Sequence, residues 1–192
     1  MNKKLEDIAA ISTGVFKKGS PSGTAYYLQA KHFDEYGRFH PEGIITPEIS
    51  MDGRLRKHLL QDGDILLVSK GFSNKACLYP AEVGPALASS TFLVISVKDE
   101  GVYPEYIQWY LNTSAMQAIL SSLARGTRIP SLSKKALAKV EVQIPSIQRQ
   151  KQILEMQRLW EKERALTFEL IELKEALYQG FLFDLTKSNT NA

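Results

Sequence analysis

The stretch VEVQIPSIQRQKQILEMQRLWEKERALTFELIELKEAL runs from Val140 to Leu177 and predicts a strand, a stop and one long helix. Val140, Val142 and Ile144 alternate with polar residues, which is the pattern of a half-buried strand. Pro145 ends that strand, because proline cannot donate to a strand ladder. The helix that follows, about 38 residues at 1.5 Å each, would be a rod of roughly 55–60 Å. That length exceeds the diameter expected of the domain before it.

An apolar stripe follows this predicted helix with the alternating three- and four-residue spacing of a coiled-coil seam. The helix is too long to bury the whole stripe against its own domain, so we expect a partner helix from a second copy or from another protein. A terminal helix that folds back on its own domain is the alternative. Glu163 occupies one seam position and weakens the match. The predicted seam consists of Met156, Leu159, Leu166, Leu170, Leu173 and Leu177.

Composition indicates a globular chain, with 192 residues, 44% hydrophobic and 23% charged, enough for one domain and an extra element. The formal net charge is +3, and from Ile147 onward seven basic residues balance seven acidic ones. The basic excess therefore lies in residues 1–146. The chain shows no signal peptide and no window of about 18 apolar residues, so we expect a cytoplasmic protein that does not enter a membrane. The single Cys77 fits a reducing compartment, excludes an internal disulfide, and is expected in the core.

The part before the long helix predicts an α+β fold, a mixed β-rich domain with short helices. Apolar runs at 65–68 and 91–97 predict buried strands, whereas Lys3–Ile11 predicts a short amphipathic piece. Residues 103–124 predict two helices, with Asn112 or Ser114 as the cap of the second. Ser133 is expected to cap another short helix. The expected divisions are a recognition domain over 1–146, a coiled-coil helix over 147–185 and a disordered tail over 186–192.

Signatures of common enzymes are missing from the sequence. It contains no phosphate-binding loop, no dinucleotide fingerprint and no nucleophile elbow. The three histidines lack metal-ligand spacing and are expected at the surface. Asp62 and Asp64 flank a tight turn, where aspartate is favoured for backbone reasons. We therefore expect no catalytic residues, no metal and no cofactor.

Four polar, basic loops that contain glycine are the main chemical feature of residues 1–146. Lysine and arginine neutralise phosphates, glycine lets the backbone approach them, and asparagine can read adenine. Arg54, Arg56 and Lys57 lie in one such loop. Between Glu105 and Glu141 the sequence contains no acidic residue. We predict DNA contact from the other three loops through Lys17, Lys18, Ser69, Lys70, Ser73, Asn74, Lys75, Arg125, Thr127 and Arg128.

From about Leu5 to Leu185, the order of these segments resembles the specificity subunit of type I restriction-modification enzymes. The matching segments are GDILLVSKG (63–71), ASSTFLVIS (88–96), YPEYIQWYLNTSAMQAIL (103–120) and GTRIPSLSKKALAKVEVQIPSIQRQKQI (126–153). The last segment resembles the family most strongly, with a glycine-bearing loop, a short Leu-Ser helix, a strand ending in Ile-Pro and a helix start rich in glutamine.

The resemblance implies a non-catalytic target recognition domain that reads DNA, followed by a long helix. Family members usually carry two such units, each reading half of a bipartite site, with the two helices paired antiparallel between them. This chain has one unit, so we expect a homodimer that reads an interrupted palindrome. The methyltransferase (M) subunits and, through them, the restriction (R) subunits would supply the chemistry.

Two other classes remain open at this point, a protein-protein adaptor with a helical scaffold and a nuclease whose site the motifs miss.

Overall fold

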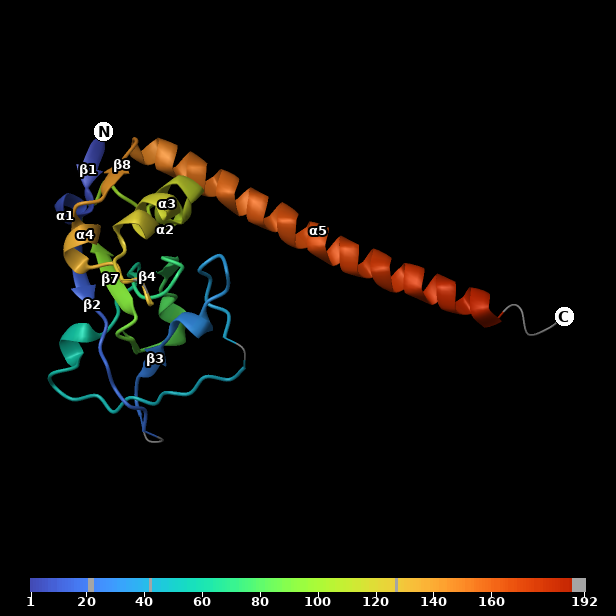
Figure 1. Cartoon of the computed structure of the whole chain (residues 1–192), viewed down its shortest axis with the longest axis horizontal. Helices are drawn as coiled ribbons and strands as arrows, with labels where there is room; N and C mark the ends of the chain where they lie inside the picture. Colours follow the sequence, from blue (N-terminus) through green and yellow to red (C-terminus); the bar gives the residue numbers. More distant parts are fainter. Residues whose placement is uncertain (21–22, 42, 127, 188–192) are drawn as a thin grey trace. The chain divides into compact units, whose positions relative to one another are not determined.

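The computed structural model describes residues 1–20, 23–41, 43–126 and 128–187. Contacts along the chain divide it into two units, Met1–Gln150 and Lys151–Ala192, and each is described by itself (Figure 1). In the described part of the chain, none of the helices combines the length and the apolar character needed to cross a membrane.

The centre of the first unit is an antiparallel four-stranded sheet in the order β2-β7-β4-β5. Its strands are β2 (Ala9–Thr13), β4 (Ile65–Val68), β5 (Ala76–Leu78) and β7 (Phe92–Val97). The strands predicted at 65–68 and 91–97 are confirmed, and both occupy the middle of the sheet, where every residue of β4 is buried. Continuous apolar runs suit this position because both faces of a central strand are covered.

Two further strand pairs flank this sheet. β1 (Asn2–Lys4) pairs antiparallel with β8 (Glu141–Gln143), and β3 (Tyr26–Leu28) pairs parallel with β6 (Ala86–Ala88). The amphipathic piece expected over Lys3–Ile11 is helical only in the single turn α1 (Leu5–Ile8), between β1 and β2. Its apolar positions are nevertheless buried, because strand and turn together bring Leu5, Ile8 and Ile11 to the interior.

Three helices complete the first unit: α2 (Pro104–Asn112), α3 (Ser114–Leu123) and α4 (Lys134–Ala138). α2 and α3 lie next to each other in Figure 1. Ser133 caps α4 as predicted, since its Oγ accepts from the Ala136 N–H at 3.1 Å. The cap of α3 is Thr113, without a side-chain cap bond, so the prediction of Asn112 or Ser114 is wrong.

Instead of capping a helix, Asn112 binds the backbone of the outer strand β5. Its Oδ1 accepts from the Ala76 N–H at 2.9 Å, and its Nδ2 donates to the Ala76 carbonyl at 2.7 Å. Gln108 Nε2 donates to the same carbonyl at 3.0 Å. A strand edge left open is a template for aggregation, and α2 covers part of this one.

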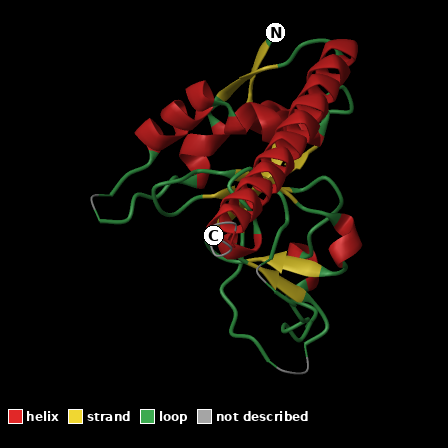
Figure 2. Cartoon of the chain, turned by 90° about the vertical axis from the view of Figure 1, so that its right-hand side faces the viewer, coloured by secondary structure: helices red, strands yellow, loops and turns green. Residues whose placement is uncertain are grey.

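The main hydrophobic cluster gathers buried side chains from the central sheet and from the β3–β6 pair. Cys77 is fully buried in it, which confirms its predicted core position. Three short 3₁₀ turns, η1 (Ala30–His32), η2 (Arg56–His58) and η3 (Ala81–Val83), lie in the connections. Loops make up much of the unit, as the green segments of Figure 2 show.

The last helix, α5 (Ile147–Lys187), has 41 residues, and its first turn belongs to the first unit. Gln150 in that turn is fully buried. Its Nε2 donates to the carbonyls of Gly101 (2.9 Å) and Pro145 (3.0 Å), and its Oε1 accepts from the Tyr103 N–H at 3.0 Å. The predicted α+β fold with a long final helix is therefore confirmed. Residues 188–192 of the expected tail lie outside the described residues.

Candidate nucleic-acid interface

The register of the four-stranded sheet brings loops from distant parts of the sequence to one end of it. Thr13, the last residue of β2, pairs with Leu93, and Val68, the last residue of β4, pairs with Phe92. Leu67 pairs with Ala76, the first residue of β5. The 14–20 loop after β2 and the 69–75 loop after β4 therefore leave the same end of the sheet. One strand separates their origins, which puts them about 10 Å apart.

A third loop, 125–131, joins the 69–75 loop through backbone hydrogen bonds. The Gly71 N–H donates to the Pro130 carbonyl at 2.9 Å, and the Leu132 N–H donates to the Ser69 carbonyl at 2.8 Å. Arg125 and Ser131 exchange two backbone bonds of 3.0 and 2.8 Å, which close the base of the third loop. We call the three loops 14–20, 69–75 and 125–131 the loop cluster.

Glycines form the tight bends of two of these loops. Gly71 has φ +110° and Gly126 has φ +118°. Residues other than glycine adopt these backbone angles only with strain. A Cβ at Gly126 would also lie 2.9 Å from the Ile129 carbonyl oxygen. These two positions therefore require glycine for backbone reasons alone.

Six of the predicted DNA-contact residues are exposed on the loop cluster: Lys17, Lys18, Lys70, Ser73, Arg125 and Arg128. Among the residues that the structure describes, the five cations in this set form no ion pair with a carboxylate. Their charges are available to a polyanion, and grouping on one end of a sheet adds their fields together. Thr127, another of the predicted contact residues, lies outside the described residues.

Three other predicted contact residues use their polar groups inside the protein. Ser69 and Asn74 are buried. Ser69 Oγ donates to the Thr91 carbonyl at 2.8 Å, and Asn74 Nδ2 donates to the Val68 carbonyl at 3.0 Å. The half-buried Lys75 donates from Nζ to the Asp34 carbonyl. In this structure these side chains shape the base of the 69–75 loop, and their contact with DNA remains an untested prediction.

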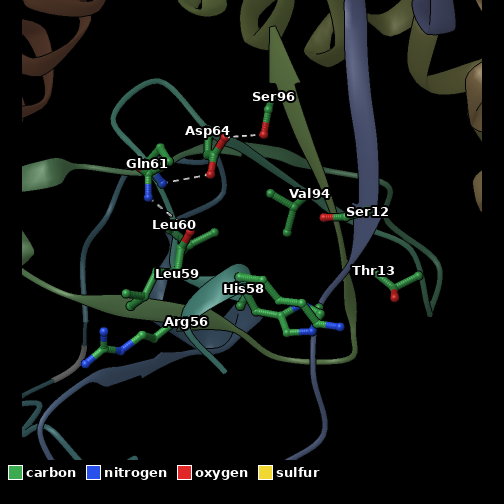
Figure 3. Close-up of a pocket in the computed structure, with 13 residues that line it drawn as sticks. Ser12, Thr13, Arg56, His58, Leu59, Leu60, Gln61, Asp64, Val94 and Ser96 are labelled. Atoms are coloured by element: carbon green, nitrogen blue, oxygen red, sulfur yellow. Dashed lines mark hydrogen bonds between the residues drawn. The ribbon is translucent and has the colours of Figure 1, made fainter. Parts of the chain in front are cut away.

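A polar cavity of about 300 Å³ lies against the end of β2 (Figure 3). Ser12 and Thr13 line one side of it, and η2, with Arg56, Lys57 and His58, lines another. Hydroxyls and cations are the side chains that bind phosphate oxygens. The sequence indicates the basic character of this segment, but not that it lies beside β2.

Among the described residues that line this cavity, the acidic side chain of Asp64 is held by hydrogen bonds within the protein. Asp64 is buried, and its two carboxylate oxygens accept from the Gln61 N–H at 2.8 Å and from Ser96 Oγ at 2.5 Å (Figure 3). The turn role predicted for this aspartate agrees with the bond to Gln61, since that bond closes the 61–64 turn. The partner Ser96 is 32 residues away and has no signal in the sequence.

Two reactive side chains outside the loop cluster, Cys77 and His32, are buried. Burial raises the pKa of the Cys77 thiol to about 12, which leaves it protonated and unreactive near neutral pH. His32 was expected at the surface, but it is buried, and its Nδ1 accepts from the Gln29 N–H at 3.2 Å. Burial lowers the pKa of His32. Within the described ranges, no three or more His, Cys, Asp and Glu side chains are grouped as metal ligands would be.

The predicted seam residues all lie in α5. Between 51% and 67% of the surface of each of these residues is exposed. Trp160, Phe168 and Ile171 add exposed apolar surface beside them. The 41 residues of α5 correspond to about 60 Å of helix.

An antiparallel sheet with a cationic loop cluster at one end, followed in the sequence by a long helix, points to the class of nucleic-acid recognition domains. Residues 1–173 match the family model described as the type I restriction modification DNA specificity domain. The chain belongs to this family, which confirms the resemblance seen in the sequence and its assignment as a non-catalytic DNA specificity domain. The family match does not favour the two alternatives, a protein-protein adaptor and a nuclease.

Three solved structures share this fold with the chain at low sequence identity. The S subunit of a type I restriction-modification system from M. genitalium shares 13% identity at a TM-score of 0.58, and covers 99% of this chain and 46% of its own. The HsdS subunit from Thermoanaerobacter tengcongensis shares 14% identity with this chain at a TM-score of 0.61. The match covers 86% of this chain and 38% of the HsdS chain. A chain from a study of complex assembly and conformational transition of the type I R-M system shares 16% identity at a TM-score of 0.67. This match covers 100% of our chain and 50% of the solved one.

This chain therefore spans half or less of the length of these three solved proteins. No curated protein matches its sequence.

Proposed function

We propose that this chain reads one half of a bipartite double-stranded DNA site with its loop cluster and directs M subunits, and through them R subunits, to that site. The observation that carries the proposal is the convergence of three loops, distant in sequence, on one end of the sheet with five exposed cations. Cations that contact phosphates fix the register of a protein on a duplex, and polar groups among them read base edges. The proposal places the chain in the cytoplasm.

The proposed contacts follow the exposure of each side chain. Lys17, Lys18 and Lys70 would neutralise phosphates, whereas Arg125 and Arg128 suit either a phosphate or the bidentate reading of guanine. Ser73 would hydrogen bond to a base edge or a phosphate, and Thr127 keeps the same role on sequence chemistry alone. The cavity lined by Arg56 and Lys57 adds a seat for one more phosphate.

The proposal assigns α5 to homodimer formation. A stripe of large apolar side chains in a helix of this length is stable only when another surface covers it, and the seven-residue repeat fits a helix of the same kind. A second copy supplies that helix and gives a two-fold dimer. Functionally we divide the chain into a reader over 1–146 and a dimerisation and spacer helix over 147–185, with a tail over 186–192.

Gel shifts of the purified chain, alone and with its M subunits, test DNA binding at two salt concentrations. We expect affinity to fall steeply with salt, because phosphate contacts release counterions. Lys70→Ala should lower the slope of log affinity against log salt by about one on every sequence. Lys98→Ala is the matched control, since Lys98 is exposed but follows β7 at the opposite end of the sheet. Equal slopes for the two variants would contradict the interface.

Mapping of methylated bases in cells that express the chain with its M subunits identifies the site. We expect an interrupted palindrome. Arg128→Ala should cost about 1–3 kcal/mol at one base pair if this arginine reads a base, and a uniform loss if it contacts phosphate only. An adaptor would show no salt-dependent binding, and a nuclease would cleave DNA with a divalent metal and no other subunit.

A further inference from the structure

Each loop of the cluster carries one large apolar side chain that is exposed. Phe16 is 85% exposed, Phe72 is 86% exposed and Ile129 is 65% exposed. Single exposed apolar residues are ordinary on a protein surface. Three such side chains lie among the cations of one loop cluster, and the phosphate contacts proposed above do not explain this pattern.

Phe72 and Ile129 are held near each other by the backbone. Gly71, which precedes Phe72, donates to the carbonyl of Pro130, which follows Ile129. The paired backbone bonds of Arg125 and Ser131 close the 125–131 loop at its base. Neither side chain is buried, so the backbone alone holds both tips. A tip already held in place loses little conformational entropy on binding.

The charges around the pair decide which kind of partner fits. Lys70 lies two residues before Phe72, and Arg125 and Arg128 lie before Ile129, all three exposed. Apolar side chains between cations are complementary to DNA, in which the apolar faces of the bases lie between two rows of phosphates. Phenylalanine and isoleucine are among the residues that DNA-binding proteins insert between base steps, partly unstacking them and bending the duplex.

We propose that Phe72, with Ile129 beside it, inserts as a wedge into one base step of the half-site. This inference rests on the proposed function and names a further means of reading DNA, by the ease with which a step unstacks. Pyrimidine–purine steps unstack most readily, so the wedge selects such a step without a hydrogen bond to either base.

Selection from a library of randomised duplexes tests the wedge in the full-length chain. We expect wild type to enrich a pyrimidine–purine step at a fixed place in the half-site. Phe72→Ala should lose that preference and bind the selected duplex roughly tenfold or more weakly, with its salt slope unchanged. Phe72→Leu, which keeps apolar bulk, should retain part of the preference. Ile44→Ala is the matched control, since Ile44 is 97% exposed but lies outside the loop cluster.

Fluorescence of 2-aminopurine at the selected step supplies the direct measurement. Unstacking raises this signal, so wild type and Ile44→Ala should raise it and Phe72→Ala should not. Equal thermal unfolding of the variants excludes misfolding as the reason. If Phe72→Ala matches wild type in affinity and fluorescence while wild type binds duplex in a salt-dependent way, the wedge is wrong and the proposed function stands. If wild type itself shows no salt-dependent binding, the proposed function and the wedge both fail.

Discussion

At the scale of single residues, the 69–75 loop is shaped by buried polar groups and reads DNA, in our proposal, with its exposed ones. Asn74 is the clearest of the buried set. Its Nδ2 donates to Val68, and its backbone carbonyl accepts from Gln117 Nε2 at 3.0 Å. The side-chain bond joins the two ends of the loop, because Val68 ends β4 and Asn74 lies two residues before β5.

Asn74→Ala should therefore lower the free energy of unfolding by about 1–3 kcal/mol, since it leaves a buried carbonyl without its donor. Urea denaturation measures the change. The matched control is Ser73→Ala, next to it and exposed, which should stay within about 0.5 kcal/mol of wild type. If Asn74→Ala left stability unchanged and altered the choice of DNA sequence instead, Asn74 would be the base contact that the sequence alone suggests.

Two buried protons make the fold sensitive to alkali. Burial raises the pKa of Cys77 to about 12 and that of Tyr106 to about 12, and the Tyr106 hydroxyl also donates to the Gln143 carbonyl at 2.6 Å. In an unfolded chain these groups titrate near pH 8.5 and near pH 10. The unfolded state therefore loses these protons at a lower pH than the folded state does. Stability falls as the pH rises from about 8.5 to about 12, and the contribution is fully present only well below pH 8.5.

Denaturation at pH 8, 9, 10 and 11 tests this expectation. Cys77→Ala removes one titrating group, so its free energy of unfolding should decline less between pH 9 and pH 10 than that of wild type. Parallel curves for the two proteins would show that Cys77 contributes nothing to the alkaline loss.

Local signals in the sequence predict residue roles only when the partner is also local. Ser133 was predicted as a cap because its partner, Ala136, is three residues away. Asn112 carries the same kind of signal, but its partner is Ala76, 36 residues away. The bonds of Ser69 to Thr91 and of Asp64 to Ser96 are likewise set by the sheet, and no spacing in the sequence encodes them.

At the scale of elements, apolar periodicity predicts the helices and central strands but does not predict the fold of residues 2–13. The runs at 65–68 and 91–97, the break between α2 and α3, and α5 are all confirmed. Residues 2–13 fold instead as β1, one turn of helix and β2, because β8 and β7 supply hydrogen-bonding partners from far along the chain. Helical spacing and a strand–turn–strand unit bury the same apolar residues here, so periodicity does not distinguish them.

The seam of α5 makes a prediction at this scale. Leu166→Glu should dissociate the proposed homodimer, because it replaces an apolar side chain with a charge on both copies, and weaken association at least about a hundredfold. Sedimentation over a range of protein concentrations measures it. Ala165→Glu adds the same charge off the seam and should leave the dimer intact. Dissociation by both variants, or by neither, would argue against the seam.

At the scale of the whole molecule, the grouping of the loops depends on sheet register. Residues 14–20 and 69–75 are about fifty positions apart, and only the pairing of β2, β7 and β4 places them at one end of the sheet. Charge and composition predict the basic loops one at a time. They do not predict that the 125–131 loop is joined to the 69–75 loop, since backbone bonds leave no trace in side-chain identity.

A change in the length of α5 gives the prediction for the whole molecule. Duplication of residues 159–165 keeps the seam in phase and lengthens the helix by about 10.5 Å, which corresponds to about three base pairs at 3.4 Å each. The gap in the methylated site should grow by that amount, as mapping of modified bases would show. The same seven residues added after Ala192 should leave the gap unchanged. If the gap is unaltered in the duplicated variant, the length of α5 does not set the spacing of the half-sites.

The bonds from Gly71 to Pro130 and from Leu132 to Ser69 involve main-chain atoms alone. Substitutions in segments 70–73 and 126–130 therefore leave this bracing in place, as long as both glycines remain. Other loop sequences of equal length can replace these segments without changing the packing of the core. Proteins with this arrangement can therefore evolve a new DNA target through a few loop substitutions, so that target sequences diverge faster than the fold does.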